Sequence, residues 1–467
     1  MNNFFRKNIA ALLPHSPSAG RLTGRLPDKV EVQNTPSGDV TVKYGGVLIH
    51  SSYDPVKEGR EFARQAPSSR AVFLYGYGLG YHIPPLLEKI GPDGFLVAIE
   101  LNPDLLASAM VLRDQTAVLS HKRLRVVFGE DETQVAAEIA ECMSLLRQVS
   151  GGSVPEVLYH APSLKCIPGG FERIANALEI LQMERRTPAV FGGLEGRNYD
   201  LNQDLVLDSP GVKTLRGAHK NQPAILASAG PSLDDALPYL RATAGHCVLA
   251  CVDTALPILT RHGFLPHYVF SLDPQDESFA HFRDDLDCSA RLIYLPTANA
   301  RAVRSYQGER FVVFKEDHSL FKSHEALMAE KGTTRAGGSV SCLGLDCLIQ
   351  MGCDPIFLIG QDCAFSGNRI YSRHAPVNEH FLDSADRATL GRQHAGKTME
   401  KKRVAAAGHG GGSVLTNQMM YSYMRYIEEI AAAHPESRIY NLCSHGARIE
   451  NVEPLGSIRE LTKTLLV

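Results

Sequence analysis

Residues 224–243 read AILASAGPSLDDALPYLRAT, and their pattern gives the clearest indication of the fold class. Its apolar start predicts a buried strand over 224–228, the Gly-Pro-Ser triplet predicts a sharp turn, and the apolar spacing over 233–243 predicts a helix. Strand, turn and helix in this order are typical of a parallel βαβ unit.

The same alternation continues toward the end of the chain. The apolar runs predict strands at 247–252, 268–272, 291–295, 311–314, 356–359 and 439–442, and helices at 254–262, 339–351 and 415–433. This spacing predicts a mostly parallel, doubly wound sheet, which binds ligands where the carboxyl ends of its strands meet the loops. Polar residues at those strand ends therefore carry most of the functional information.

A second α/β pattern comes earlier in the chain. An apolar run at 71–75 leads into the glycine turn GYGLGYH (76–82), and a strand at 95–99 ends in Glu100. Tyr81 stands where a dinucleotide fingerprint needs its third glycine. Two interpretations stay open: a turn that serves folding alone, or a ligand site in which Glu100 holds a ribose.

These patterns define the predicted organisation of the chain. We expect an α/β fold of two Rossmann-like domains with mostly parallel, doubly wound sheets, joined by a helical connector. The N-terminal domain is expected at 1–150, the connector at 151–220 and the catalytic domain at 221–467. Within the connector, 192–210 is expected to be a loop.

The composition limits the classes of function. The 467 residues carry 48 basic and 51 acidic side chains, and this balance argues against nucleic acid as a partner because neutralising phosphates requires a basic excess. No apolar run approaches the ~18–20 residues that span a bilayer, and no signal-peptide cleavage site follows the first residues. The ten cysteines include no CxxC pair, so we expect reduced thiols, no zinc site and a cytoplasmic protein without membrane insertion.

The turn at Gly230, Pro231 and Ser232 (the GPS turn) is the first candidate site. Gly230 permits close approach of the backbone, Ser232 suits a helix N-cap, and the amides of the first helical turn favour an anion. Asp234 and Asp235 satisfy the same helix dipole without a ligand, so an anion site and a purely structural turn are equally open.

Three strand ends carry carboxylates: Asp253, Asp273 and Asp362. Acids at strand ends also occur as helix caps, but two of them beside the GPS turn favour a site at the sheet edge. By contrast, GRQHAGKT at 391–398 matches the phosphate-loop pattern but follows polar residues rather than a strand, so we expect no nucleotide site there.

Two histidines in polar loops are candidate general bases, since the pKa of imidazole lies near neutrality. His374 follows the strand that ends at Asp362, and His409 stands in the glycine run 408–412. Gly338 and Ser339 form a further flexible turn that enters a buried helix.

Together, the stretches ASAGPSLDDALPYL, CVDTALPIL, GFLPHYVFSLDPQ, GGSVSCLGLDCLIQMGCDPIFLIGQDCAFSGNRIYSRHA and SRIYNLCSHGARIENV resemble the motility-associated factor (Maf) glycosyltransferases. The resemblance covers about 221–450, and the N-terminal glycine-turn domain is similar to the domain that precedes the Maf core. That core is similar to bacterial sialyltransferases, which use CMP-activated sugars, and to archaeal 6-hydroxymethylpterin pyrophosphokinases.

The resemblance implies that a nonulosonic acid, of pseudaminic or legionaminic type, is moved from a CMP-sugar to serine and threonine hydroxyls of flagellin. It places the GPS turn at the phosphate or ribose of the donor and Gly338 and Ser339 facing the donor. Asp253 and Asp273 match positions that are commonly asparagine in sialyltransferases. The resemblance places Asp362 in a strand-end motif of the site and His374 in the loop that follows it. We therefore expect Asp362 and His374 to be catalytic, with His374 as the base and His409 as the second candidate.

This reaction inverts the configuration at the anomeric carbon of the sugar. It requires that the protein position the two substrates, stabilise the charge of the departing phosphate and supply a base for the proton of the acceptor hydroxyl. Because CMP is a good leaving group, we expect no metal and no further cofactor. Two alternatives stay open: a pterin pyrophosphokinase that uses ATP and Mg²⁺ on the same carboxylates, and a non-catalytic flagellin-binding factor. The sequence leaves the oligomeric state open.

Overall fold

The computed structural model of the chain describes residues 3–14, 16–151, 155–243, 245–366, 369–375, 403–443, 445–455, 457 and 461. It divides into two compact units, Met1–Glu179 and Ile180–Val467. The phosphate-loop-like stretch 391–398 lies outside the described residues. No helix among the described residues is both long enough and apolar enough to cross a membrane.

The second unit is built on an eight-stranded sheet in which every adjacent pair of strands is parallel. The order across the sheet is β12 (Arg310–Val312), β11 (Arg291–Tyr294), β10 (Tyr268–Ser271), β9 (Val248–Val252), β8 (Ala224–Ala227), β15 (Ile356–Ile359), β18 (Ile439–Leu442) and β19 (Glu453–Leu455). The doubly wound parallel sheet predicted from the sequence is confirmed, and β19 adds a strand at its edge.

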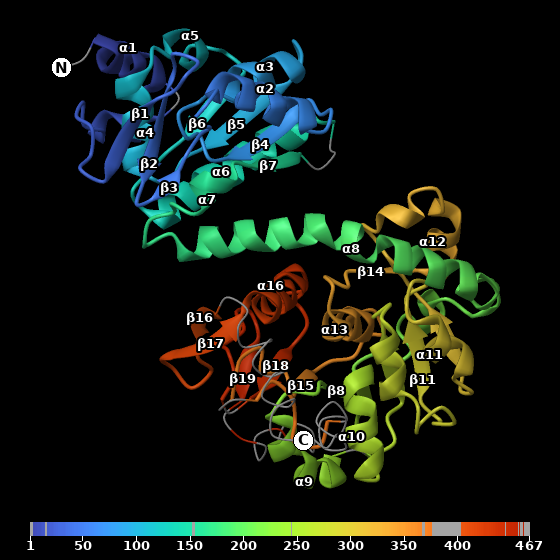
Figure 1. Cartoon of the computed structure of the whole chain (residues 1–467). Coiled ribbons are helices and arrows are strands. Elements are labelled where there is room, and N and C mark those ends of the chain that lie inside the picture. The colour runs from blue at the N-terminus through green and yellow to red at the C-terminus, as the bar shows by residue number, and fades with distance from the viewer. Residues whose placement is uncertain are drawn as a thin grey trace, which may run out of the picture. The chain divides into compact units, whose positions relative to one another are not determined.

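Helices cover both faces of this sheet, as Figure 1 shows. On β8, Ile225 packs into the core that includes residues of α9 (Leu233–Thr243) and α10 (Leu256–Arg261). Its neighbour Leu226 packs into the opposite core, with α13 (Val340–Gln350) and α16 (Gln418–Ala433). Because successive side chains of a strand point to opposite faces, continuous apolar runs are what a sheet buried on both faces requires.

The first unit holds a four-stranded parallel sheet in the order β6 (Leu124–Val127), β5 (Phe95–Ile99), β4 (Ala71–Tyr75) and β7 (Glu156–Tyr159). A three-stranded antiparallel sheet accompanies it, made of β1 (Val30–Asn34), β2 (Val40–Tyr44) and β3 (Val47–Leu48). The helices include α2 (Pro55–Gln65), α3 (Ile83–Lys89), α4 (Pro103–Leu112) and α6 (Glu132–Val149). Since β7 pairs with β4, this sheet extends past the predicted domain end at 150.

Helix α8 (Glu172–Asp208) differs from its sequence-based expectation. The predicted loop at 192–210 is helical through Asp208, and the division between the two units falls inside α8. A glycine inside a helix lowers the stability of that helix by only about 1 kcal/mol. Contacts of α8 with the rest of the second unit offset this loss: the buried Asn202 side chain donates to the carbonyls of Pro296 and Ala298 at 3.1 and 3.0 Å.

The helix predicted at 415–433 also begins later than expected. Residues through Asn417 belong to β17 (Ser413–Asn417), which pairs with β16 (Arg403–Ala407). Asn417 then caps α16, because its side-chain oxygen accepts the backbone N–H of Met420 at 2.9 Å.

Candidate active site at the switch point of the eight-stranded sheet

The eight-stranded sheet has its topological switch point between β8 and β15. From β8 the chain winds outward through β9, β10, β11 and β12, and it returns through α13 to place β15 on the other side of β8. The loops that follow β8 and β15 therefore leave in opposite directions, and open α/β sheets bind their ligands in the crevice formed at such a point. The GPS turn follows β8, and Asp362 follows β15.

The structure brings the GPS turn and Asp362 into direct contact. The Ser232 backbone N–H lies 3.2 and 3.1 Å from the two carboxylate oxygens of Asp362, and the Ser232 hydroxyl donates to Oδ2 at 2.8 Å. Both residues are buried. The Ser232 amide, which the resemblance places at the phosphate or ribose of the donor, donates to an internal carboxylate in this structure.

Gly230 is required by the same contact. Its N–H donates to the Gly360 carbonyl at 2.9 Å. A Cβ at this position would lie 2.2 Å from Oδ2 of Asp362 and 2.4 Å from the Gly360 oxygen. The sequence predicted that the backbone at Gly230 comes close to another group. In the structure that group is the loop that follows β15.

Asp362 is a buried carboxyl with several donors around it. Burial raises its pKa, while hydrogen bonds from Ser232, Cys443 and Ser366 act in the opposite direction. These donors hold the carboxyl group in one orientation, so its contacts fix the GPS turn against the end of β15.

Asp253 and Asp273 follow the neighbouring strands β9 and β10. Asp253 is buried and accepts the Ser271 hydroxyl at 2.9 Å and the Thr254 N–H at 2.8 Å. Burial raises the pKa of Asp253, and the charge of Asp273 adds to the effect. Tyr371 is 38% exposed, but partial burial of its phenol raises its pKa, and the charges of Asp253 and Asp273 add to that effect.

Asp234 organises a loop that the sequence did not connect with the GPS turn. Its buried carboxylate accepts Nη1 of Arg369 at 2.8 Å, Nε of Arg373 at 3.0 Å and the Ser372 hydroxyl. The Ser372 N–H donates to the Ala229 carbonyl at 2.8 Å. The loop at residues 369–375 (the 369–375 loop) is thereby fixed beside the GPS turn, with two guanidinium groups that are 47% and 64% exposed.

The two candidate bases lie in different surroundings. His374 is exposed at the end of the 369–375 loop, where its N–H donates to the Ser372 hydroxyl and its ring meets His262 edge-on at 4.7 Å. His409 Nε2 lies 3.3 Å from the carbonyl oxygen of Leu455, at the edge strand β19. Of the two, His374 is connected through Ser372 to Ala229, the residue that precedes the GPS turn.

Gly338 and Ser339 precede α13. Ser339 caps this helix by accepting the Ser341 N–H at 3.3 Å, and Gly338 has a φ of +84° with no atom within 4 Å of the place where a Cβ would stand. Their predicted orientation toward the donor stays a prediction.

The glycine turn of the first unit holds its own acid. The buried Glu100 accepts the N–H groups of Gly78 and Asn102 at 3.0 and 3.1 Å, and burial raises its pKa to about 7. These bonds support the interpretation in which the turn serves folding, since Glu100 is already engaged with the chain.

Two separate parts of the chain match models of known protein families. Residues 24–160 match the family model described as the glycosyltransferase Maf N-terminal domain, and residues 197–368 match the model described as 6-hydroxymethylpterin diphosphokinase MptE-like. The two matches, in this order, confirm the resemblance to the Maf glycosyltransferases that the sequence motifs indicated.

Individual relatives are distant. Two uncharacterized proteins of Treponema pallidum (strain Nichols) are each 26% identical to this chain. The first aligns over 51% of this chain and 85% of its own length, and the second over 36% of this chain and 79% of its own length. The solved structure of the MAf glycosyltransferase from Magnetospirillum magneticum AMB-1 aligns with a TM-score of 0.47 at 17% identity, covering 99% of this chain and 77% of that one.

Proposed function

We propose that the chain transfers a nonulosonic acid, of pseudaminic or legionaminic type, from a CMP-sugar to serine and threonine hydroxyls of flagellin. One observation carries the proposal: the GPS turn, Asp362 and the 369–375 loop converge at the switch point between β8 and β15. The match to the Maf N-terminal domain supports glycosyl transfer as the reaction class.

The donor phosphate meets Arg369 and Arg373 in this proposal. Asp362 already accepts the Ser232 amide and hydroxyl, so neither donor is left for a phosphate. The two guanidinium groups share the single carboxylate of Asp234 and remain about half exposed, so they keep donors for a phosphate.

His374 receives the proton of the acceptor hydroxyl. The acceptor oxygen forms its bond to the anomeric carbon as the bond from that carbon to the CMP phosphate oxygen breaks, CMP leaves with the bonding electrons, and the configuration inverts. Asp362 acts as a positioning residue that holds the GPS turn, and His409 is the alternative base.

The experiment combines purified chain, flagellin and a CMP-nonulosonate, and follows the intact mass of flagellin and the release of CMP. Loss of a charge-assisted phosphate contact costs about 1.5–3 kcal/mol, so Arg373→Gln is expected to weaken CMP binding about 10- to 100-fold. Arg438→Gln is the matched control, because Arg438 forms a similar ion pair with Asp354 at the other end of β18.

The roles of the histidines are tested in the same assay. His374→Ala is expected to abolish transfer while CMP binding and the circular dichroism spectrum are retained, and His409→Ala is expected to keep transfer. Transfer by His374→Ala at the wild-type rate would remove His374 from the mechanism.

A second candidate function rests on the match of residues 197–368 to the MptE-like model and on the paired acids Asp253 and Asp273. It is a pyrophosphokinase that uses ATP and Mg²⁺, with these acids as metal ligands. Thermal shifts with CMP, CTP and ATP–Mg²⁺ distinguish the transferase from the kinase: stabilisation by ATP–Mg²⁺ alone favours the kinase.

The same measurement tests the third alternative. Flagellin capture without a thermal shift by any nucleotide favours a non-catalytic binding factor.

A further inference from the structure

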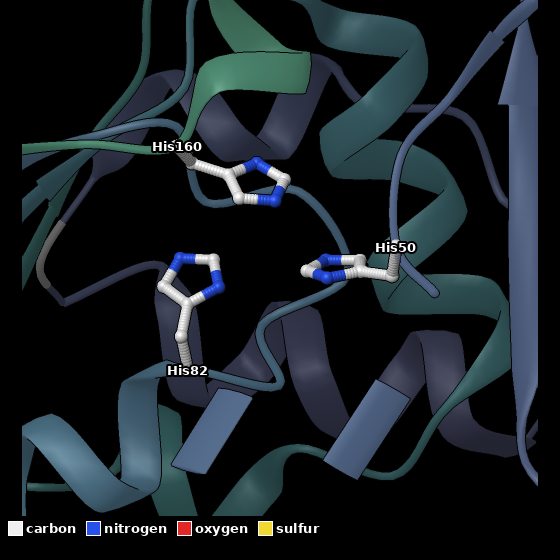
Figure 2. Close-up of side chains that lie close together, drawn as sticks. All are labelled: His50, His82 and His160. Carbon is white, nitrogen blue, oxygen red and sulfur yellow. The ribbon is translucent and has the colours of Figure 1, made fainter. Parts of the chain in front are cut away.

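Three buried histidines meet at the switch point of the other sheet, in the first unit. There the chain winds from β4 through β5 to β6 on one side, and β7 lies on the other side of β4. His160 directly follows β7, His82 ends the glycine turn that follows β4, and His50 comes shortly after β3. Figure 2 shows their three rings turned toward one another around a common space.

The geometry of this group (the histidine cluster) suits a metal ion. One ring nitrogen from each residue lies within 4.8 Å of those of the other two, and the ring centroids are 4.6, 4.9 and 5.6 Å apart. Zinc–nitrogen bonds of about 2.0–2.1 Å in a tetrahedral site require the nitrogens to be roughly 3.4 Å apart. The nitrogens therefore have to approach one another by up to about 1.4 Å (4.8 − 3.4 Å). The stacked rings, His50 on His160 and His82 on His160 at interplanar angles of 26° and 23°, have to turn so that their in-plane lone pairs converge on the ion.

Each ring also has a partner for its second nitrogen. Nδ1 of His50 lies 3.1 Å from Oε2 of Glu58, and Nε2 of His82 lies 2.9 Å from the Gly76 carbonyl oxygen. Nδ1 of His160 lies 2.8 Å from the Ser163 hydroxyl. Metal-binding histidines almost always pair their other nitrogen with a carboxylate, a carbonyl or a similar group, which orients the ring.

The remaining nitrogens are Nε2 of His50, Nδ1 of His82 and Nε2 of His160. The His160 ring also forms a hydrogen bond with the Ile49 backbone, which an ion bound to Nε2 would replace. The Leu79 N–H donates to Nε2 of His50 at 3.0 Å, so an ion there replaces this hydrogen bond. Two formal charges act on the cluster: that of Glu58, which contacts His50, and that of Arg113. Burial lowers the pKa of His50 and of His82, and the charge of Arg113 lowers both further. Burial likewise lowers the pKa of His160, and neutral imidazole is the form that binds metals.

We propose that His50, His82 and His160 bind one divalent transition-metal ion of the zinc class in the N-terminal unit. Three imidazoles without a carboxylate favour such an ion over Mg²⁺ or Ca²⁺, which prefer oxygen ligands. The ion joins the segment after β3 to the loops after β4 and β7, and so links the antiparallel sheet region to the parallel sheet. The site is independent of the transfer reaction proposed for the second unit.

The test uses the full chain, stripped with a chelator, dialysed and then titrated with Zn²⁺. We expect one zinc per chain by elemental mass spectrometry and a rise in the melting temperature. Substituted Co²⁺ should give a visible spectrum without the charge-transfer band of a thiolate ligand. No binding to the wild-type chain, or a thiolate band, overturns the proposal.

Variants assign the ligands. His82→Gln and His160→Gln are expected to lose the stoichiometric zinc, whereas the control His262→Gln, a histidine outside the cluster, retains it. Glu58→Gln is expected to bind zinc about 10- to 100-fold more weakly, because an outer partner of a ligand is lost. Circular dichroism reports whether each variant folds. Stoichiometric zinc in both folded cluster variants contradicts the assignment, and if they do not fold, the wild-type Co²⁺ spectrum decides.

Discussion

Gly230→Ala tests the close contact at the switch point. The added Cβ would lie 2.2 Å from Oδ2 of Asp362 and 2.4 Å from the Gly360 oxygen, whereas real Cβ contacts are essentially never shorter than 3.0 Å. Neither neighbour yields easily: the Gly360 oxygen accepts the Gly230 N–H, and Ser232 holds the carboxylate with two donors. The GPS turn therefore has to move away from β15.

Overpacking of this kind costs about 1–3 kcal/mol, and we expect the free energy of unfolding of the second unit to fall by that amount. Urea unfolding followed by far-ultraviolet circular dichroism measures it, since the chain has no tryptophan. Gly245→Ala is the matched control beyond the other end of α9, where a Cβ meets no atom within 4 Å. Equal unfolding midpoints for the two variants and the wild type would refute the described contact.

Three further substitutions test other parts of the account. Ser232→Ala removes the 2.8 Å donor to the buried Asp362 carboxyl, so we expect a loss of about 1–3 kcal/mol in urea unfolding, and a wild-type midpoint would contradict it. Asp234→Asn removes the charge that holds Arg369 and Arg373. Because one charge-assisted bond contributes about 1.5–3 kcal/mol, we expect the transfer rate to fall at least about tenfold while the circular dichroism spectrum stays unchanged. Full transfer by this variant argues against the 369–375 loop as part of the site. Glu100 has a folded pKa of about 7 against 4.5 in the unfolded chain, so its contribution to stability is complete below pH 4.5 and is lost as the pH rises through 7. The free energy of unfolding of the wild type, relative to that of Glu100→Gln, should therefore fall by about 3 kcal/mol between pH 4.5 and pH 7. A relative stability that does not change with pH would exclude the raised pKa.

The strands and helices of the sheets were largely predictable because their signals are local. The apolar run, turn and helix of 224–243 appear as β8 and α9 within one residue of the predicted bounds, since each depends on neighbouring residues only. Helix α8 was not predictable to its end, because contacts such as those of Asn202 with residues almost 100 positions away offset its glycines.

The candidate site was predictable in its parts but not in its contacts. Parallel topology places Ser232 and Asp362 at one edge of the sheet, yet nothing local indicates that Asp362, 130 residues later, takes both donors of Ser232. The ion pair of Arg369 with Asp234 spans 135 residues and was missed for the same reason. The histidine cluster has no local spacing signal. The pairing of β7 with β4 brings His160 to His82, and His50, which follows β3, is held against the glycine turn by the Leu79 N–H.

A crystal structure of the chain grown with CMP would show whether the nucleotide binds at the switch point between β8 and β15. Density for the nucleotide is expected at the carboxyl ends of β8 and β15, with its phosphate against Arg369 and Arg373 and the GPS turn alongside. CMP bound solely at the glycine turn of the first unit, or a crystal in which ATP–Mg²⁺ binds at Asp253 and Asp273 and CMP does not bind, would contradict this expectation.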